Sequence, residues 1–186
     1  MKPKDADKPP AEESHPEPDD VDPAIQATLA RVALGDKDWS VRMAAVERLT
    51  LQSVLARIAR TDADSDIRKL AVSRMTDQNA LAKVATDDGD WSVRRTATAK
   101  LTDQAALARI AVADEDSDIR KLAVSLLRDQ SALARVARGD KDWTVRMAAV
   151  EKLADAGALA QVALNDQDAD IRKRAVGRLS ELATHP

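Results

Sequence analysis

The chain has 186 residues, a net charge of −3 and no cysteine, which excludes disulfides, thiolate metal sites and thiol nucleophiles. Its two histidines, His15 and His185, lie near the chain ends, outside the regular part of the sequence. No stretch approaches the roughly 18 consecutive apolar residues of a membrane span, and residues 1–10 lack the apolar core of a signal peptide. The sequence therefore predicts a cytoplasmic protein that does not associate with membranes.

Residues 1–23 form a separate region that is rich in Pro, Asp, Glu and Lys. They contain three lysines and eight acidic residues, a local charge of −5, so the rest of the chain carries +2 of the total of −3. Such a segment has too few apolar residues to offset the entropy that it loses on ordering. We predict a disordered acidic tail over residues 1–23 and a folded region over residues 24–186. The nearly neutral charge of the folded region does not favour a broad nucleic-acid-binding field.

The folded region repeats a heptapeptide every 26 residues. The segment DKDWSVR at residues 36–42 returns with its Trp at residues 88–94 and 140–146, and a variant without Trp, such as DADSDIR at residues 62–68, follows each of these copies. A period this short and regular corresponds to one supersecondary unit. The six units fill residues 26–181 and begin at Gln26, Gln52, Gln78, Gln104, Gln130 and Ala156.

Each unit is predicted to contain two short helices, A and B. The first helix A begins at Asp22 and Pro23, an N-cap residue followed by Pro at the first helical position. In the second unit, apolar residues three and four apart run from Leu55 to Ala59, and the same rhythm resumes from Ile67 to Met75 after an Asp-rich break. Alanines recur in step on both helices and allow adjacent units to approach closely. We therefore predict an all-α fold, a right-handed α-solenoid of six 26-residue two-helix repeats.

The charged residues of the heptapeptide have a structural explanation. Its second Asp falls where helix B begins, which is a favourable N-cap beside the positive end of the helix dipole. Its Arg lies six residues after the first Asp, and we predict that each Arg bridges to the first Asp of a neighbouring unit in a bidentate geometry that favours Arg over Lys. The predicted ladder comprises Asp36, Arg42, Asp62, Arg68, Asp88, Arg94, Asp114, Arg120, Asp140, Arg146, Asp166 and Arg172.

With these residues the sequence resembles the HEAT-like repeat family. The second helix of that repeat is typically preceded by an Asp and carries a Val-Arg pair five and six residues later, as do Asp36, Val41 and Arg42 here. The match covers residues 24–181, and its pattern is also similar to the leucine-rich variant repeats. The unit is shorter than usual for HEAT repeats and lacks the Pro common in their first helix. The variant repeats can carry an iron–sulfur cluster on cysteines outside the repeats, which a chain without Cys cannot hold, so no cofactor is expected.

A Trp directly follows the capping Asp in every second unit, and the other units have Ser or Ala there. Five residues later the sizes are reversed, since Ala or Thr accompanies Trp, and Leu or Arg accompanies the small residue. One interpretation is volume compensation between adjacent layers. The other is a binding role, because a Met or Arg four residues after each Trp can cover the indole ring, and Trp and Arg are enriched in binding hot spots. The residues predicted to bind a partner along helix B are Trp39, Met43, Lys69, Trp91, Arg95, Lys121, Trp143 and Met147.

Two other patterns give weaker hypotheses. The triplet Asp62, Asp64 and Asp66 is similar to a calcium loop, but Ile67 stands where an EF-hand needs Gly and Ser73 where it needs Glu, so no metal site is predicted. Helix A carries a basic row that would suit a nucleic-acid backbone, as in some HEAT-like proteins. Acidic loops flank this row and no aromatic platform accompanies it, which favours a solvated surface. The row consists of Arg31, Arg57, Lys83, Arg109 and Arg135.

The sequence contains few of the patterns that accompany catalysis. No Ser lies in a nucleophile-elbow pattern, and the five glycines are scattered rather than gathered in a phosphate-binding loop. A HEAT-like lyase or chaperone remains an alternative that rests on the resemblance alone. We predict a non-enzymatic scaffold that binds an acidic or amphipathic protein or peptide. Its last unit is predicted to be a cap, with Lys173, Arg174 and Arg178 on a polar outer surface.

Overall fold

The computed structural model describes residues 22–184, which form twelve α-helices and no strand over this range. Of the predicted tail, only Asp22 and Pro23 are described, and they are the N-cap and the first residue of α1. Residues 1–21, which make up nearly all of the predicted disordered tail, lie outside the described residues, as do residues 185 and 186.

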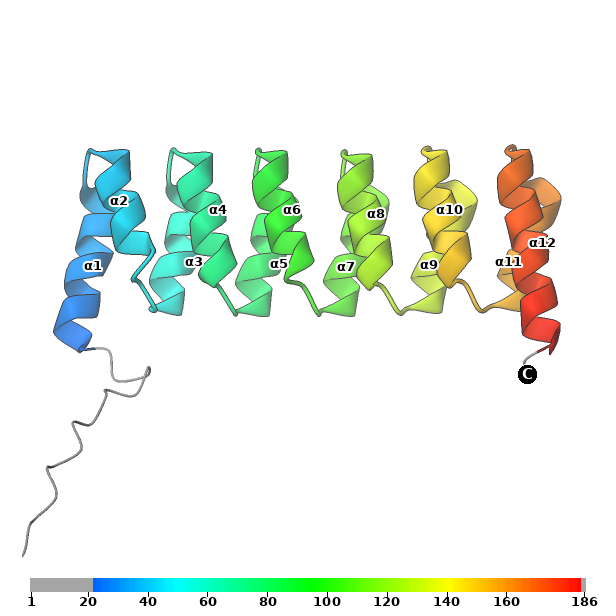
Figure 1. The fold of residues 1–186 in the computed structure, drawn as a ribbon, viewed down its shortest axis with the longest axis horizontal. Coiled ribbons are helices and arrows are strands. Elements are labelled where there is room, and N and C mark those ends of the chain that lie inside the picture. The colour runs from blue at the N-terminus through cyan, green and yellow to red at the C-terminus, as the bar shows by residue number, and fades with distance from the viewer. Residues whose placement is uncertain (1–21, 185–186) are drawn as a thin grey trace, which may run out of the picture.

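The helices form six hairpins that stand side by side in a row (Figure 1). The odd-numbered helices are α1 (Pro23–Gly35), α3 (Gln52–Thr61), α5 (Gln78–Asp87), α7 (Gln104–Ala113), α9 (Gln130–Gly139) and α11 (Ala156–Asn165). The even-numbered helices are α2 (Trp39–Val46), α4 (Ser65–Arg74), α6 (Trp91–Ala99), α8 (Ser117–Leu126), α10 (Trp143–Lys152) and α12 (Ala169–Thr184).

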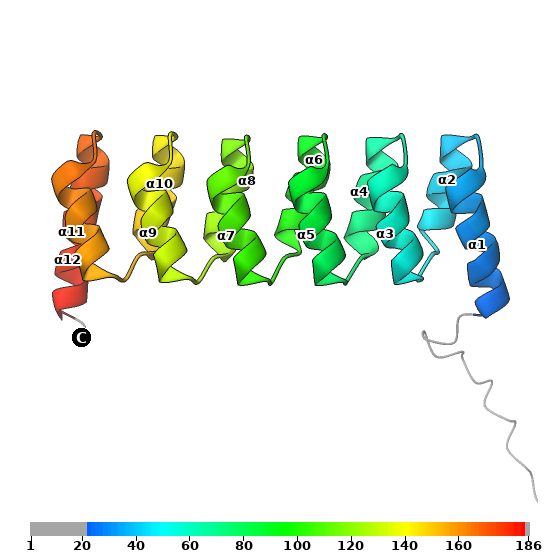
Figure 2. The same cartoon turned by 180° about the vertical axis from the view of Figure 1, so that it is seen from behind.

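The two sets of helices make two layers, with the even helices in front in Figure 1 and the odd helices in front in Figure 2. In Figure 1 the chain rises in the rear layer, crosses at the upper loops, descends in the front layer and advances to the right. This path is clockwise as it recedes along the row. The predicted right-handed α-solenoid is therefore confirmed.

Aspartate side chains begin most of the helices. Asp64 caps α4 by accepting hydrogen bonds from the backbone N–H groups of Asp66 and Ile67 at 2.8 and 3.3 Å. Asp103 caps α7 in the same way, with the N–H of Ala105 at 2.8 Å. These carboxylates satisfy N–H groups that have no partner within the helix and lie at the positive end of its dipole. The repeated Asp therefore sets where each helix begins.

The core lies between the two layers and repeats with the units. The equivalent residues Leu81 of α5 and Leu107 of α7 are fully buried, as are Ile67 of α4 and Ile119 of α8. Alanines of the even helices are buried at every unit and include Ala71, Ala97, Ala123 and Ala149. Neighbouring even helices approach one another more closely than neighbouring odd helices do. Small side chains make this approach possible, so the layers stack tightly where the sequence predicts that they should.

A glutamine at the start of each of the first five units holds the connection to the next unit. The Oε1 atom of Gln78 accepts from the backbone N–H of Thr102 at 2.8 Å, and its Nε2 donates to the carbonyl of Lys100 at 3.2 Å. Equivalent pairs of bonds are made by Gln26, Gln52, Gln104 and Gln130. In the sequence these glutamines mark only the unit boundaries, and their pattern does not predict this role. Unit 6 has Ala156 instead, and its α12 continues to Thr184.

Candidate partner-binding site

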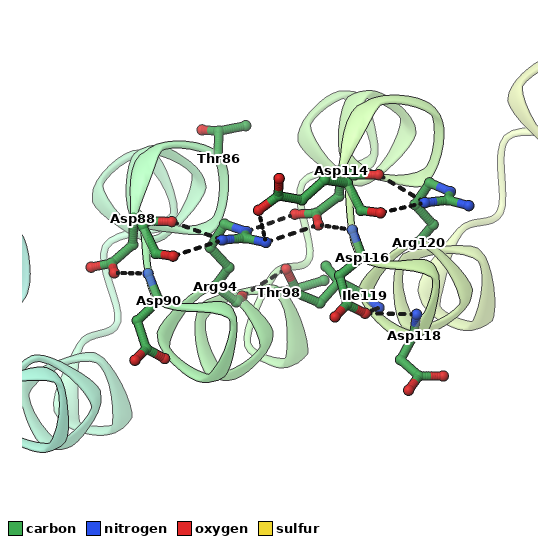
Figure 3. Close-up of polar contacts among 12 residues, drawn as sticks. Thr86, Asp88, Asp90, Arg94, Thr98, Asp114, Asp116, Asp118, Ile119 and Arg120 are labelled. Atoms are coloured by element: carbon green, nitrogen blue, oxygen red, sulfur yellow. Dashed lines mark hydrogen bonds and ion pairs between the residues drawn. The ribbon is translucent and has the colours of Figure 1, made fainter.

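The arginines of the heptapeptide join each unit to the next by bidentate ion pairs. Arg94 donates Nε and Nη2 to the two carboxylate oxygens of Asp114 at 3.0 and 3.3 Å, and its Nη1 donates to the carbonyl of Asp88 at 3.0 Å (Figure 3). One guanidinium therefore holds its own loop and the loop of the next unit. The five pairs are Arg42–Asp62, Arg68–Asp88, Arg94–Asp114, Arg120–Asp140 and Arg146–Asp166.

These ion pairs are satisfied by further hydrogen bonds. The carboxylate of Asp114 also accepts the backbone N–H of Asp116 at 2.9 Å (Figure 3). The most buried pair is Arg120 with Asp140, whose side chains are 2% and 4% exposed. The hydrogen bonds to Asp140 raise the pKa of Arg120, because they stabilise its charged form. A buried ion pair tolerates the loss of its hydration only when its remaining donors and acceptors are engaged in this way.

The ladder has an open end in each terminal unit. The carboxylate of Asp36 accepts the backbone N–H of Asp38 at 2.9 Å, but it has no ion-pair partner among residues 22–184. At the other end, Nη1 of Arg172 donates to the carbonyls of Asp166 and Gln167 at 2.7 and 3.2 Å, and no carboxylate of the described residues lies within ion-pairing distance. The predicted residues thus make five rungs and leave one aspartate and one arginine over.

The three tryptophans lie on the surface and not in the core. Trp39, Trp91 and Trp143 are the first residues of α2, α6 and α10, and they are 56%, 56% and 54% exposed. None of them belongs to the cluster of buried residues between the layers or to the partly buried residues that pack against it. The interpretation of the tryptophans as packing residues is therefore not supported by their positions.

The other predicted binding residues lie on the same layer of even helices (Figure 1). Met43 and Met147, four residues after a Trp, are partly buried against the core, and Arg95 is exposed in the same position of α6. In the units between, Lys69 is partly buried and Lys121 is exposed. The surface consequently alternates between a unit with an exposed indole and a unit with an exposed or partly exposed ammonium group.

Charge pairing limits the basic character of the intervening units. The ammonium group of Lys69 lies 2.7 Å from the carboxylate of Asp66, which raises the pKa of Lys69 through this hydrogen bond. Lys173 faces Asp170 in the same relation at 3.4 Å. The row of even helices therefore combines apolar rings with local pairs of opposite charge and is not a continuous basic strip.

A hydroxyl residue follows each Trp and strengthens the helix cap before it. The hydroxyl groups of Ser40, Ser92 and Thr144 donate to the capping carboxylates at 2.6, 2.6 and 2.7 Å. These hydrogen bonds lower the pKa of Asp38, Asp90 and Asp142, because they stabilise the carboxylate form. In the other units this position is an Asp, which has no such proton to donate when it is ionised. The helix turn that carries each Trp is thus fixed by an additional bond.

We expect these three caps to make the fold sensitive to acid. Since the pKa of each capping carboxylate is lower in the folded state than in the unfolded state, the contribution to stability is complete above about pH 4 and is lost as the pH falls through the folded-state pKa. The urea midpoint measured at about pH 3 should therefore fall below that at about pH 6. Replacing Ser40 and Ser92 by Ala and Thr144 by Val should reduce the difference between the two midpoints. An undiminished difference in the triple variant would contradict this role of the hydroxyl groups.

The Asp triplets serve the fold. Asp62 pairs with Arg42, and Asp64 caps α4, so both carboxylates have partners within the protein. Within the described range, no group of three or more His, Cys, Asp or Glu side chains is arranged to hold a metal ion. The helices of this range also include none that is long and apolar enough to cross a membrane.

The predicted basic row lies on the odd helices, in the layer opposite the tryptophans (Figure 2). Its members are exposed, and none of them forms an ion pair with another residue between 22 and 184. They are Arg31, Arg57, Lys83, Arg109 and Arg135. The two candidate surfaces are therefore separate and can be tested independently.

No family model matches the sequence, and no curated protein matches it either. The all-α solenoid rests on the structure itself, while membership of the HEAT-like repeats stays a prediction from the motif.

Proposed function

We propose that the protein is a cytoplasmic, non-enzymatic scaffold of HEAT-like repeats that binds a protein or peptide along the layer of even helices. The observation that carries the proposal is the exposure of Trp39, Trp91 and Trp143 at equivalent positions of one layer. Units 2 and 4 have Ser65 and Ser117 there, so the fold does not require an aromatic ring at this position. Large exposed rings that the fold does not need are typical of binding hot spots.

The spacing of the tryptophans favours an extended partner. Helices packed about 8 to 10 Å apart place tryptophans of alternate units roughly 20 Å from one another. An extended chain rises about 3.3 Å per residue, so its apolar anchors would recur roughly every six residues. Between the indoles, the surface offers Lys69, which pairs with Asp66 of its own helix, and the exposed Lys121. These features support a segment that alternates apolar and acidic residues, or an amphipathic one.

The first test is a selection of displayed peptides on the wild-type protein, followed by titration of the selected peptides. Intrinsic fluorescence reports only on these three sites, because the chain has three Trp and no Tyr or Phe. We expect binding to shift the Trp emission, and we expect replacement of all three by Ser to weaken binding by roughly a hundredfold. Ser is the matched substitution because the chain already uses it at Ser65 and Ser117.

A control variant, Val112→Ser, removes an exposed apolar side chain from α7 in the opposite layer and should bind as the wild type does. Equal binding by the triple Ser variant would contradict the proposal. So would a protein that binds only nucleic acid, unaffected by the Trp substitutions and released by moderate salt. That result would instead assign the function to the basic row of the odd helices.

A further inference from the structure

The two ends of the row carry the two residues of one further Arg–Asp ion pair of the ladder. In the first five units, Nε and Nη2 of the heptapeptide Arg bind the Asp of the next unit, as in Arg146 with Asp166. In unit 6 the same two atoms of Arg172 have no carboxylate partner within the described part of the chain. The unpaired carboxylate of Asp36 lies in unit 1, at the other end of the row. The charges of the two ends are therefore complementary.

Apolar residues are buried at each junction between neighbouring units, and the equivalent residues are more exposed only at the two ends of the row. Val176 of unit 6 is 53% exposed, whereas the equivalent Val124 and Val150 are fully buried. Val41 of unit 1 is 41% exposed, whereas the equivalent Ile67 is fully buried. The same difference holds for Ala163 in unit 6 and Leu29 in unit 1, which are partly buried although their equivalents in the other units are buried. Each end thus exposes one of the two apolar surfaces that are buried against each other at the internal junctions.

The polar residues predicted to cap unit 6 leave Val176 of its outer surface exposed. Arg174 binds both carboxylate oxygens of Glu151 in unit 5, at 2.7 and 2.8 Å, and Arg178 donates to the carbonyl of Leu153 in the same unit. Both side chains also bind the carboxylate of Glu181 in their own helix, so their charges are paired within units 5 and 6. Lys173 lies 3.4 Å from Asp170 of its own helix, and both side chains are exposed. The outer surface of unit 6 is left with Val176 exposed.

We propose that copies of this chain associate end to end, with unit 6 of one copy packing on unit 1 of a second copy. Arg172 would then bind Asp36 of the second copy as a sixth rung, and Val176 and Val41 would be buried as their equivalents are at the internal junctions. The occupant is a second copy because the five internal junctions already show which surface fits each end. A contact of this kind joins two different surfaces, so it adds copies head to tail and does not form a two-fold symmetric pair.

The contact should be weaker than an internal junction and reversible. Unit 6 has Ala156 in place of the glutamine that holds each internal connection, and α12 runs on through Thr184 where the other even helices end. No chain connection holds the two copies together, so association must also offset the loss of translational freedom. We therefore expect association that depends on protein concentration and weakens with salt, because an ion pair lies at its edge. This inference does not depend on the function proposed for the tryptophans.

Sedimentation equilibrium of the full chain over a range of concentrations tests the proposal through charge reversal. The wild type should show an average mass that rises with concentration. The variants Asp36→Arg and Arg172→Glu should each associate more weakly by roughly tenfold or more, because each places like charges across the contact. A mixture of the two variants should recover the association, because Glu at position 172 of one copy then meets Arg at position 36 of the other.

Two further variants distinguish this contact from other causes of association. Lys173→Glu makes the same change of charge one residue from Arg172 and should associate as the wild type does. Val176→Asp keeps the hydrogen bonds of Arg172 to its own loop but puts a carboxylate into the apolar part of the contact between copies. It should weaken association. A wild type that stays monomeric at all concentrations would overturn the proposal. So would single variants that associate like the wild type, or an association lost only when the three tryptophans are replaced by Ser.

Discussion

Replacing Arg120 by Met is expected to lower the free energy of unfolding by about 3–5 kcal/mol, because it leaves the buried carboxylate of Asp140 without its counterion. The Asp140 side chain is only 4% exposed, so water can replace little of the lost interaction. The variant also loses the hydrogen bond that Nη1 of Arg120 donates to the carbonyl of Asp114 at 2.9 Å. One substitution therefore weakens both the loop of unit 4 and its junction with unit 5.

Urea denaturation followed by circular dichroism measures this loss, and the chain offers a matched control. Arg172→Met removes the same side chain and the same kind of bond to its own loop, but at a position with no carboxylate partner in the described structure. Its effect should be smaller by at least about 2 kcal/mol. Adding Asp140→Asn to Arg120→Met should recover part of the stability, because the amide oxygen can still accept from Asp142 without carrying a charge. Equal losses for Arg120→Met and Arg172→Met would contradict a stabilising role for the ladder.

Val124→Asp is expected to cost more than about 4 kcal/mol, because it buries a carboxylate with no partner at a fully sealed junction. The equivalent Val176→Asp, at a position that is 53% exposed, should change stability by no more than about 0.5 kcal/mol. The comparison holds the residue type and the place in the repeat constant. It varies only whether a further unit covers the position.

Val124→Thr provides a polar control for the buried site. Unit 3 already has Thr98 there, fully buried, with its hydroxyl donating to the carbonyl of Arg94 at 2.9 Å. We expect this variant to be much more stable than Val124→Asp, because the hydroxyl can find the same acceptor one turn back. Thermal unfolding of the wild type and of these three variants gives the order of their stabilities directly. A Val176→Asp variant as unstable as Val124→Asp would show that the end of unit 6 is not open.

Much of the fold could be predicted because its determinants are local and repeated. The 26-residue period, the capping Asp before each helix B and the apolar spacing within one unit together indicate stacked hairpins. The pairing of Arg and Asp between units follows from the same repetition, since residues at one position of every unit form a line along the stack. A pattern seen six times makes an interaction between neighbours easier to predict than it would be in a single domain.

The remaining features depend on which way the side chains point in three dimensions, which the repeated sequence pattern does not specify. The alternation of Trp with Ser fits both packing and exposure, and only the placement of the first turn of helix B decides between them. The role of Gln78 was missed because its main partners are backbone groups 22 and 24 residues away, which have no signature in the sequence. The contacts of Arg174 could not be predicted for the same reason, because it binds Glu151, 23 residues earlier in the chain, as well as Glu181 of its own helix.

The most direct test of the central claim, that the tryptophans serve a partner and not the core, is the unfolding free energy of the variant with Ser at positions 39, 91 and 143. The structure predicts a total change of no more than about 1.5 kcal/mol, as for three surface substitutions. A loss of several kcal/mol would show that the indoles hold the units together and would contradict the claim.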